Sequence, residues 1–352
     1  MIAFVCLYCY LLIVWNVSQN IKDTKRRKKV QCIASGLGLL FLLGFHSTTL
    51  GCDVAISYIP AFEQTGTRFV TSIDDSIYGF ELGYMNYMAL IHYFTDDAQV
   101  FLFITALIIL IPIIALIYKY SQNVMLSILI YTSWYLYYFS FSGLRQAMAI
   151  GICAIATNFL FKRKLLPFVA IVYLASFFHT SALLFWLVYP MYVYRYKISN
   201  KNLFILGILA ICILVFFQGS MQFVAMILFG SESRYVESLE NSEFGGVTIA
   251  LIYLAFALFQ MYLDKKNSNP YLPILFFLAA IQMTGMYSQT IPRLAYYFIP
   301  IFSLSFPQAL NAINKSMRFI YQSALLILFV SFFMMQASSH YLDVTPFKFF
   351  WE

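Results

Sequence analysis

The sequence predicts an all-α protein that crosses a membrane about twelve times, and three observations lead to this fold class. Hydrophobic residues make up 62% of the 352 residues and charged residues only 11%, whereas a soluble globule carries roughly a quarter of charged residues. Uncharged apolar runs recur along the whole chain. Short basic loops separate many of them. We therefore expect a single transmembrane domain over residues 1–352, without a separate soluble domain.

The apolar runs mark the expected helices, because about 20 apolar residues are needed to cross ~30 Å of hydrocarbon. Their approximate bounds are 2–18, 31–50, 99–118, 123–140, 146–161, 165–178, 180–194, 202–219, 246–263, 271–287, 294–310 and 319–337.

Basic residues orient these segments. If the basic run from Lys22 to Lys29 is cytoplasmic, alternation places seventeen of the 22 Lys and Arg residues inside. Thirteen of the 15 acidic residues and all 4 histidines then fall outside. Both termini and two long loops, 51–97 and 219–245, are expected on the outer, periplasmic face. Topology thus accounts for the net charge of +7, and we expect no nucleic-acid binding.

The charge-free run from Leu165 to Tyr194 allows two interpretations. A single span would place Arg195 and Lys266 outside, against the charge trend. Two short helices, 165–178 and 180–194, keep both cations inside, but each is only ~21 to 23 Å long. They are therefore expected to form a short or re-entrant hairpin, with His179 at its turn.

Arg145 interrupts the long apolar sequence SFSGLRQAMAI. A cation at this depth is costly unless an anionic group meets it. Arginine suits such a site, because its guanidinium binds phosphate in a bidentate manner and stays charged when partly desolvated. Arg145, Arg234 and Arg293 stand at outer ends of spans and are candidate phosphate-binding residues. Snorkelling, or pairing with an outer carboxylate, is the alternative for each.

Three outer residues are candidate general bases: Asp53 in GCDVAISY, Glu81 in FELGYMNY and His179 in FFHTSALLF. Burial raises the pKa of a carboxyl group and a neighbouring arginine lowers it, so either acid suits a site beside Arg145. His179 either acts as a base or caps a helix turn. The sequence leaves the choice among the three open. No third ligand accompanies the acidic pairs of the 51–97 loop, so no metal or other cofactor is expected.

Several segments, in this order, resemble the EpsG family of exopolysaccharide and O-antigen polymerases, the Wzy-type enzymes. They are GCDVAISYIPAF, FELGYMNY, SGLRQAMAIGICA, FFHTSALLF, SRY near residue 234, PRLAYYFIP and the aromatic tail PFKFFWE.

The resemblance implies a metal-independent glycosyltransferase of the bacterial inner membrane, with a GT-C-like architecture and a periplasmic active site. Its substrates would be two undecaprenyl-pyrophosphate-linked glycans, one the donor and one the acceptor. A chain-length regulator protein is a further expected partner. Arg145, Arg234 and Arg293 would bind pyrophosphate, and Asp53, Glu81 or His179 would deprotonate the acceptor. The expected sugar path includes Gln146, Tyr58, Tyr84 and Asn86.

Two other functions are kept as alternatives. A membrane O-acyltransferase would use His179 as its base, but its donor would enter from the cytoplasm, away from the candidate residues. A lipid-linked-oligosaccharide flippase or other transporter commonly has ionisable groups near mid-membrane and internal repeats. Here the charges gather at one face and no repeat is visible.

Overall fold

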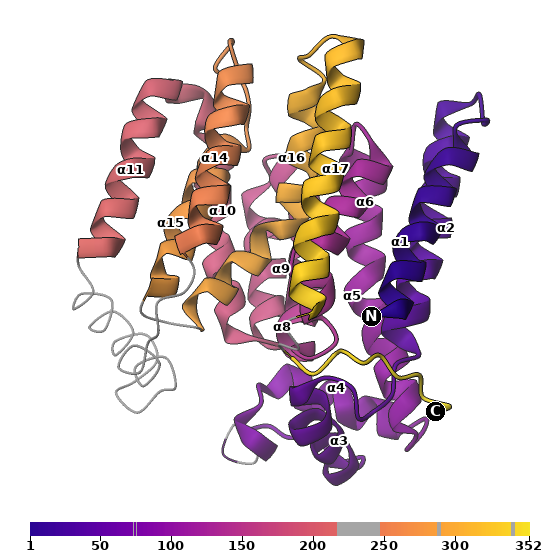
Figure 1. Ribbon diagram of the computed structural model, residues 1–352. Coiled ribbons are helices and arrows are strands. Elements are labelled where there is room, and N and C mark those ends of the chain that lie inside the picture. The colour runs from indigo at the N-terminus through magenta and orange to yellow at the C-terminus, as the bar shows by residue number, and fades with distance from the viewer. Residues whose placement is uncertain (73, 75, 217–246, 287–289, 339–341) are drawn as a thin grey trace. The chain divides into compact units, whose positions relative to one another are not determined.

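The computed structural model describes residues 1–352 except 73, 75, 217–246, 287–289 and 339–341 (Figure 1). The described residues are helical and contain no strand beyond an isolated bridge between His46 and Phe349. The predicted all-α class is therefore confirmed.

The α-helices of the described residues are α1 (Ile2–Ser18), α2 (Thr24–Gly44), α3 (Ile59–Thr65), α4 (Leu82–His92), α5 (Ala98–Tyr120), α6 (Val124–Ser133), α7 (Leu136–Phe139), α8 (Leu144–Phe161), α9 (Leu165–Ser176), α10 (Val188–Val193), α11 (Asn200–Phe216), α14 (Val247–Leu263), α15 (Leu272–Met283), α16 (Ile299–Leu310) and α17 (Lys315–Ser338). Shorter π- and 3-10 segments are η1 (Val54–Tyr58), η3 (Ile77–Gly79), η4 (Thr180–Leu187), η5 (Arg195–Lys197), η6 (Thr284–Met286) and η7 (Ile291–Phe298).

Several expected helices have different bounds in the structure, and two of these differences have a clear local cause. α2 begins at Thr24 rather than at residue 31, because the Asp23 carboxylate caps it by accepting from the backbone N–H groups of Lys25 and Arg26. Lysine and arginine are also good helix formers, so the helix extends beyond its apolar part. The expected 123–140 helix is divided into α6 and α7, because Tyr135 between them has a φ of 52°.

Among the described residues, three helices are long and apolar enough to cross a membrane: α5, α8 and α17. Other apolar helices of the described residues are shorter, among them α1, α9 and α14. The protein is therefore a membrane protein. The short α9 and the η4–α10 segment are separated at residues 177–179, so the two-helix interpretation of 165–194 agrees with the helix boundaries.

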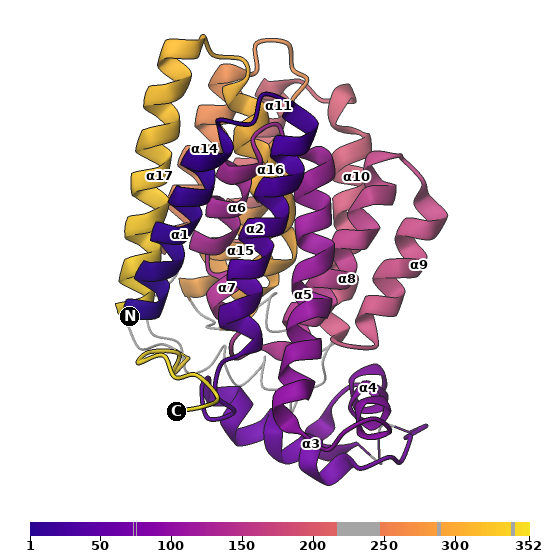
Figure 2. The ribbon, with the colours of Figure 1, turned by 90° about the vertical axis from the view of Figure 1, so that its right-hand side faces the viewer.

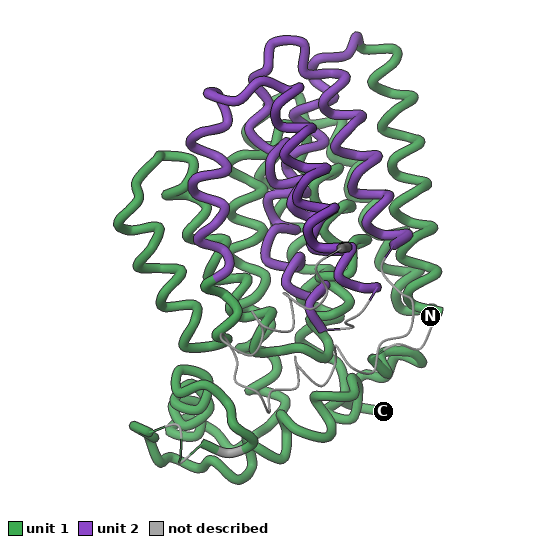
Figure 3. The backbone as a smooth tube through the Cα atoms, turned by 90° about the vertical axis from the view of Figure 1, so that its left-hand side faces the viewer, with its two compact units in different colours: residues 1–183, 315–352 green, residues 184–314 purple. Residues whose placement is uncertain are grey.

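The chain divides into two compact units, residues 1–183 with 315–352 and residues 184–314, called unit 1 and unit 2 (Figure 3). In unit 1, α2 packs on α1 and α5, α5 on α8, and α8 on α9, while α17 packs on α6. In unit 2, α15 packs between α11 and α14.

Basic loops gather at one end of unit 1. The Lys28 ammonium donates to the Ser121 carbonyl over 2.8 Å, which brings the α5–α6 turn to the start of α2. Tyr120 packs against Phe161, so the turn after α8 lies at this end too. The opposite end of unit 1 holds both chain termini, α3 and α4 (Figure 2). The basic loops and the 51–97 segment therefore lie at opposite ends of unit 1.

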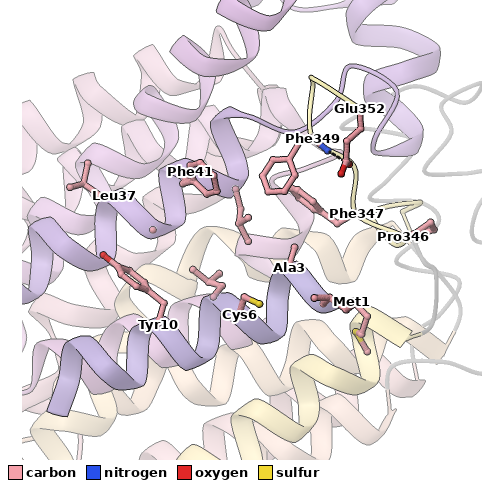
Figure 4. A pocket seen from close by; sticks show the side chains of 14 residues that line it. Met1, Ala3, Cys6, Tyr10, Leu37, Phe41, Pro346, Phe347, Phe349 and Glu352 are labelled. Atoms are coloured by element: carbon pink, nitrogen blue, oxygen red, sulfur yellow. Dashed lines mark hydrogen bonds between the residues drawn. The ribbon is translucent and has the colours of Figure 1, made fainter. Parts of the chain in front are cut away.

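The aromatic C-terminal tail packs against the end of α2. The Ser47 amide donates to the Lys348 carbonyl, and the Phe350 amide donates to the Phe45 carbonyl. Phe349 stacks on Trp351 with ring centroids 4.4 Å apart. Phe347, Phe349 and Glu352 also line an apolar groove of about 830 Å³ beside α1 and α2 (Figure 4).

A buried ion pair joins two loops of unit 2. Arg195 has a fully buried side chain, and its guanidinium lies 3.0 Å from Asp264. Arg195 also donates to the carbonyls of Ile198 and Asn269 and to the Asn200 side chain. The network ties residues 195–200 to residues 264–269.

Candidate active site

Three of the residues predicted for the site meet at the end of unit 1 that holds α4. Arg145 Nη1 lies 2.6 Å from Glu81 Oε2, and His179 Nδ1 lies 2.9 Å from Glu81 Oε1. The backbone N–H of Thr180 also donates to Oε1 over 3.0 Å. Glu81, Arg145 and His179 are mostly buried, with 13%, 22% and 19% of their side chains exposed. The Glu81 carboxylate therefore binds the Arg145 guanidinium, the His179 imidazole and the Thr180 amide.

Helix ends hold these side chains in place. Glu81 is the N-cap residue of α4, but its carboxylate makes no hydrogen bond to that helix. Arg145 lies in the first turn of α8, and His179 follows the end of α9. Gly83 permits the approach, since a Cβ there would lie 2.6 Å from the Phe177 carbonyl oxygen, which accepts from the Gly83 amide.

The Glu81 carboxylate stays ionised in this setting. Burial alone would raise the pKa of its carboxyl group. The His179 hydrogen bond and charge, the charge of Arg145 and the Thr180 amide outweigh burial and lower the pKa to about 2. A carboxylate with so low a pKa is a weak general base near neutral pH. Its geometry instead suits it to positioning Arg145 and His179.

The hydrogen bond to Glu81 defines which nitrogen of His179 carries the proton. A carboxylate only accepts hydrogen bonds, so Nδ1 must be the protonated nitrogen facing Glu81. In the neutral ring this leaves Nε2 with a lone pair. The same carboxylate–imidazole arrangement orients a general base in many hydrolytic sites. His179 is therefore the better base of this pair.

Arg145 is paired with the Glu81 carboxylate, as the alternative prediction for this residue had it. Its guanidinium also packs over an aromatic ring. Its guanidinium carbon lies 4.2 Å from the centre of the Phe80 ring. Such a cation–π contact helps to keep a partly desolvated guanidinium charged and oriented. Arginine has five N–H donors; Glu81 accepts from Nη1, and the Tyr58 hydroxyl is a second side-chain hydrogen-bond partner. The pairing thus leaves donors for a further anion.

A family model of the EpsG family matches residues 29–349. The chain belongs to the EpsG family. Membership indicates a membrane protein of polysaccharide biosynthesis. No curated protein and no solved structure gave a match.

Two tyrosines of this EpsG-family protein lie beside the cluster. Tyr58 and Tyr84 are buried, with ring centroids 5.6 Å apart. Burial raises the pKa of the Tyr58 phenol, although the charge of Arg145 acts in the opposite direction. The Tyr84 hydroxyl is buried and, within the described chain, has no hydrogen-bond partner. Both phenols therefore remain neutral, and the Tyr58 oxygen accepts a hydrogen bond from Arg145.

Other predicted residues of the EpsG-family chain lie apart from these contacts. The Asp53 amide donates over 3.2 Å to the hydroxyl of Ser142, three positions before Arg145 in the chain, and the Asp53 charge acts on the nearby Tyr58 phenol. Asn86 uses both side-chain polar atoms to pair with the backbone of Val70, a structural role. Gln146 is buried next to Arg145.

The remaining two predicted arginines belong to other parts of the chain. Arg293 belongs to η7 of unit 2. Arg234, with the rest of the expected 219–245 loop, lies outside the described residues.

Sequence reasoning missed three contributors to the site of this EpsG-family protein. Phe80 lies under Arg145, the Thr180 amide binds Glu81, and Gly83 permits the close approach of the two segments. Phe80 and Gly83 lie within two positions of Glu81, and Thr180 follows His179. Each is therefore close in sequence to a predicted site residue. A glycine two positions after an acid was the available signal, since glycine permits close backbone contact.

Proposed function

We propose that this EpsG-family protein is a polysaccharide polymerase that transfers a growing glycan from undecaprenyl pyrophosphate to a lipid-linked repeat unit. The observation that carries the proposal is the partly buried cluster of Glu81, Arg145 and His179 at the end of unit 1 opposite its basic loops. It combines a cation suited to pyrophosphate with an oriented base.

The proposed reaction needs an anion-stabilising group and a base. The bond between the anomeric carbon and the pyrophosphate oxygen breaks, and the electron pair leaves with the pyrophosphate. An acceptor hydroxyl forms the new bond to that carbon and gives up its proton. Arg145 stabilises the charge that develops on the leaving group, and His179 Nε2 takes the proton.

The Glu81 carboxylate positions both groups and balances their charge before substrate binds. When a pyrophosphate approaches, the guanidinium and the phenols of Tyr58 and Tyr84 offer hydrogen-bond donors to it. Arg234 and Arg293 are proposed as further phosphate-binding residues, and Gln146 as a residue along the sugar path. Asp53 remains an alternative base. We further propose about twelve membrane crossings, a GT-C-like architecture and a periplasmic active site in the bacterial inner membrane.

The test uses the purified full-length protein in liposomes with a lipid-linked repeat unit as the sole substrate. A ladder of longer lipid-linked glycans, read by gel or mass spectrometry, is expected without nucleotide sugar. Arg145→Lys should reduce the rate by about 10²- to 10³-fold, because an ammonium lacks the planar fork of donors. His179→Gln should reduce it by about 10²- to 10⁴-fold through loss of the base.

Matched controls come from the 51–97 segment, which also holds Glu81. Arg68→Lys changes an exposed arginine, and His92→Gln changes a histidine whose two ring nitrogens already contact Asp96 and the Phe62 carbonyl. Both controls should retain full ladders. Normal ladders from Arg145→Lys and His179→Gln would refute the assigned site. Movement of the lipid-linked unit across the bilayer without elongation would identify a transporter instead.

A further inference from the structure

A second apolar groove, of about 790 Å³, runs between α2 and α5 in unit 1. These two helices pack side by side (Figure 2). The groove is lined by residues at helical spacing on both helices, including Ile33, Gly36 and Leu40 from α2 and Leu107, Ile111 and Ile114 from α5. Each helix thus contributes one continuous apolar stripe.

The dimensions of this groove match one leaflet of a bilayer. From Lys29 to Leu40 the helix rises about 16 Å, which is about half of the ~30 Å hydrocarbon thickness. Ile33, Leu37 and Ile111 line it and remain 53%, 61% and 60% exposed. Gly36 deepens it, since the nearest carbons to a Cβ placed there belong to Ile114 at 3.8 Å. An acyl chain therefore fits along the groove.

Three cations lie at the mouth of the groove. Lys25, Arg26 and Lys29 line it and are exposed. Asp23 lies there too, and its carboxylate caps α2. Lys28, by contrast, donates to the Ser121 carbonyl. A topology signal requires only that this run be on one side of the membrane. Such a signal does not require Lys25, Arg26 and Lys29 to lie together at the end of an apolar groove.

We propose that the α2–α5 groove binds an anionic phospholipid from the leaflet at the basic end of unit 1. The lipid phosphate would contact Lys25, Arg26 and Lys29, and an acyl chain would lie along Ile33, Leu40 and the facing stripe of α5. Basic pockets between transmembrane helices are suited to such headgroups. This inference does not depend on the proposed polymerase reaction.

The groove in Figure 4 offers an internal comparison. It is similarly apolar, but its charged side chain is the Glu352 carboxylate, and no Lys or Arg side chain lines it. Charge at the mouth, rather than apolar character, therefore distinguishes the α2–α5 groove. The lipid bound there should be selected by its headgroup.

The test titrates full-length protein in neutral detergent with phosphatidylglycerol, phosphatidylcholine or inorganic phosphate, and measures bound lipid by native mass spectrometry. We expect phosphatidylglycerol to bind at least about tenfold more tightly than phosphatidylcholine, because each membrane-surface cation contributes about a fivefold preference for an anionic lipid. Inorganic phosphate alone should bind weakly. The combined change Lys25→Gln, Arg26→Gln and Lys29→Gln should abolish the preference.

Two controls separate the groove from general surface charge. Lys162→Gln, Arg163→Gln and Lys164→Gln together remove the same charge from another basic loop and should leave the preference within about twofold. Gly36→Leu keeps every cation but fills the groove, so it should weaken phosphatidylglycerol binding, whereas Ala3→Leu in the groove of Figure 4 should not. Equal losses in the two charge variants, or unchanged binding by Gly36→Leu, would overturn the proposal.

Discussion

At the scale of single residues, the site depends on the hydrogen bonds that the Glu81 carboxylate accepts. Glu81 accepts hydrogen bonds from Arg145, His179 and the Thr180 amide, and these donors favour its ionised form. Removing one partner of such a buried charge cluster is costly, because the remaining charges stay desolvated. Glu81 is thus expected to matter for stability as well as for positioning.

The stability that Glu81 confers should depend on pH. Its pKa falls from 4.5 to about 2 on folding, so its contribution is complete above pH 4.5 and is lost as the pH falls through about 2. The shift corresponds to about 3 kcal/mol. Thermal unfolding in detergent should show wild type more stable than Glu81→Gln at pH 7, with the difference shrinking below pH 4.5. A constant difference between pH 7 and pH 3 would contradict this account.

At the scale of elements, helix ends and loops carry the specific contacts, while apolar helices carry the packing. The cluster joins the starts of α4 and α8 to the end of α9. In unit 2, the Arg195–Asp264 pair similarly joins the turn after α10 to the turn after α14. Polar networks at helix ends therefore define how neighbouring short helices connect.

Breaking the unit 2 pair should destabilise the protein. Arg195→Ala leaves Asp264, which is 6% exposed, without its charged partner. The expected loss is about 3 to 5 kcal/mol of unfolding free energy, measured by denaturant unfolding in detergent. Lys197→Ala, an exposed cation two residues away, is the control and should change stability by less than about 0.5 kcal/mol. Equal effects of the two substitutions would rule out a stabilising role for the pair.

At the scale of the whole molecule, charge is unevenly distributed between the two ends of unit 1. Basic turns gather at one end of unit 1, and the candidate active site lies at the other. Arg145 lies at the end that is poor in cations, against the general trend for basic residues to gather on one side of a membrane.

The predicted orientation can be tested with reporter fusions. A reporter inserted after Lys266 should report the cytoplasm, and one inserted after Gly66 should report the periplasm. The reason is that residues 165–194 form two segments rather than one, which preserves the alternation of sides. A periplasmic signal after Lys266 would mean that 165–194 crosses only once.

The sequence alone determined the all-α membrane class and, with small shifts, the helix positions. Hydropathy and helix capping act over a few residues, so both can be read from neighbouring letters. The exceptions, such as the early start of α2 and the break at Tyr135, arose where a cap or a local backbone angle overrode hydropathy.

Only the tertiary structure decided which of the candidate bases meets Arg145. Glu81 and His179 are separated from each other by 98 positions, and Glu81 from Arg145 by 64. No local pattern encodes contacts over such distances, because they depend on how α4, α8 and α9 end at the same place. The fold brought the Glu81 carboxylate into contact with both Arg145 and His179, whereas Asp53 contacts Ser142 and Cys52.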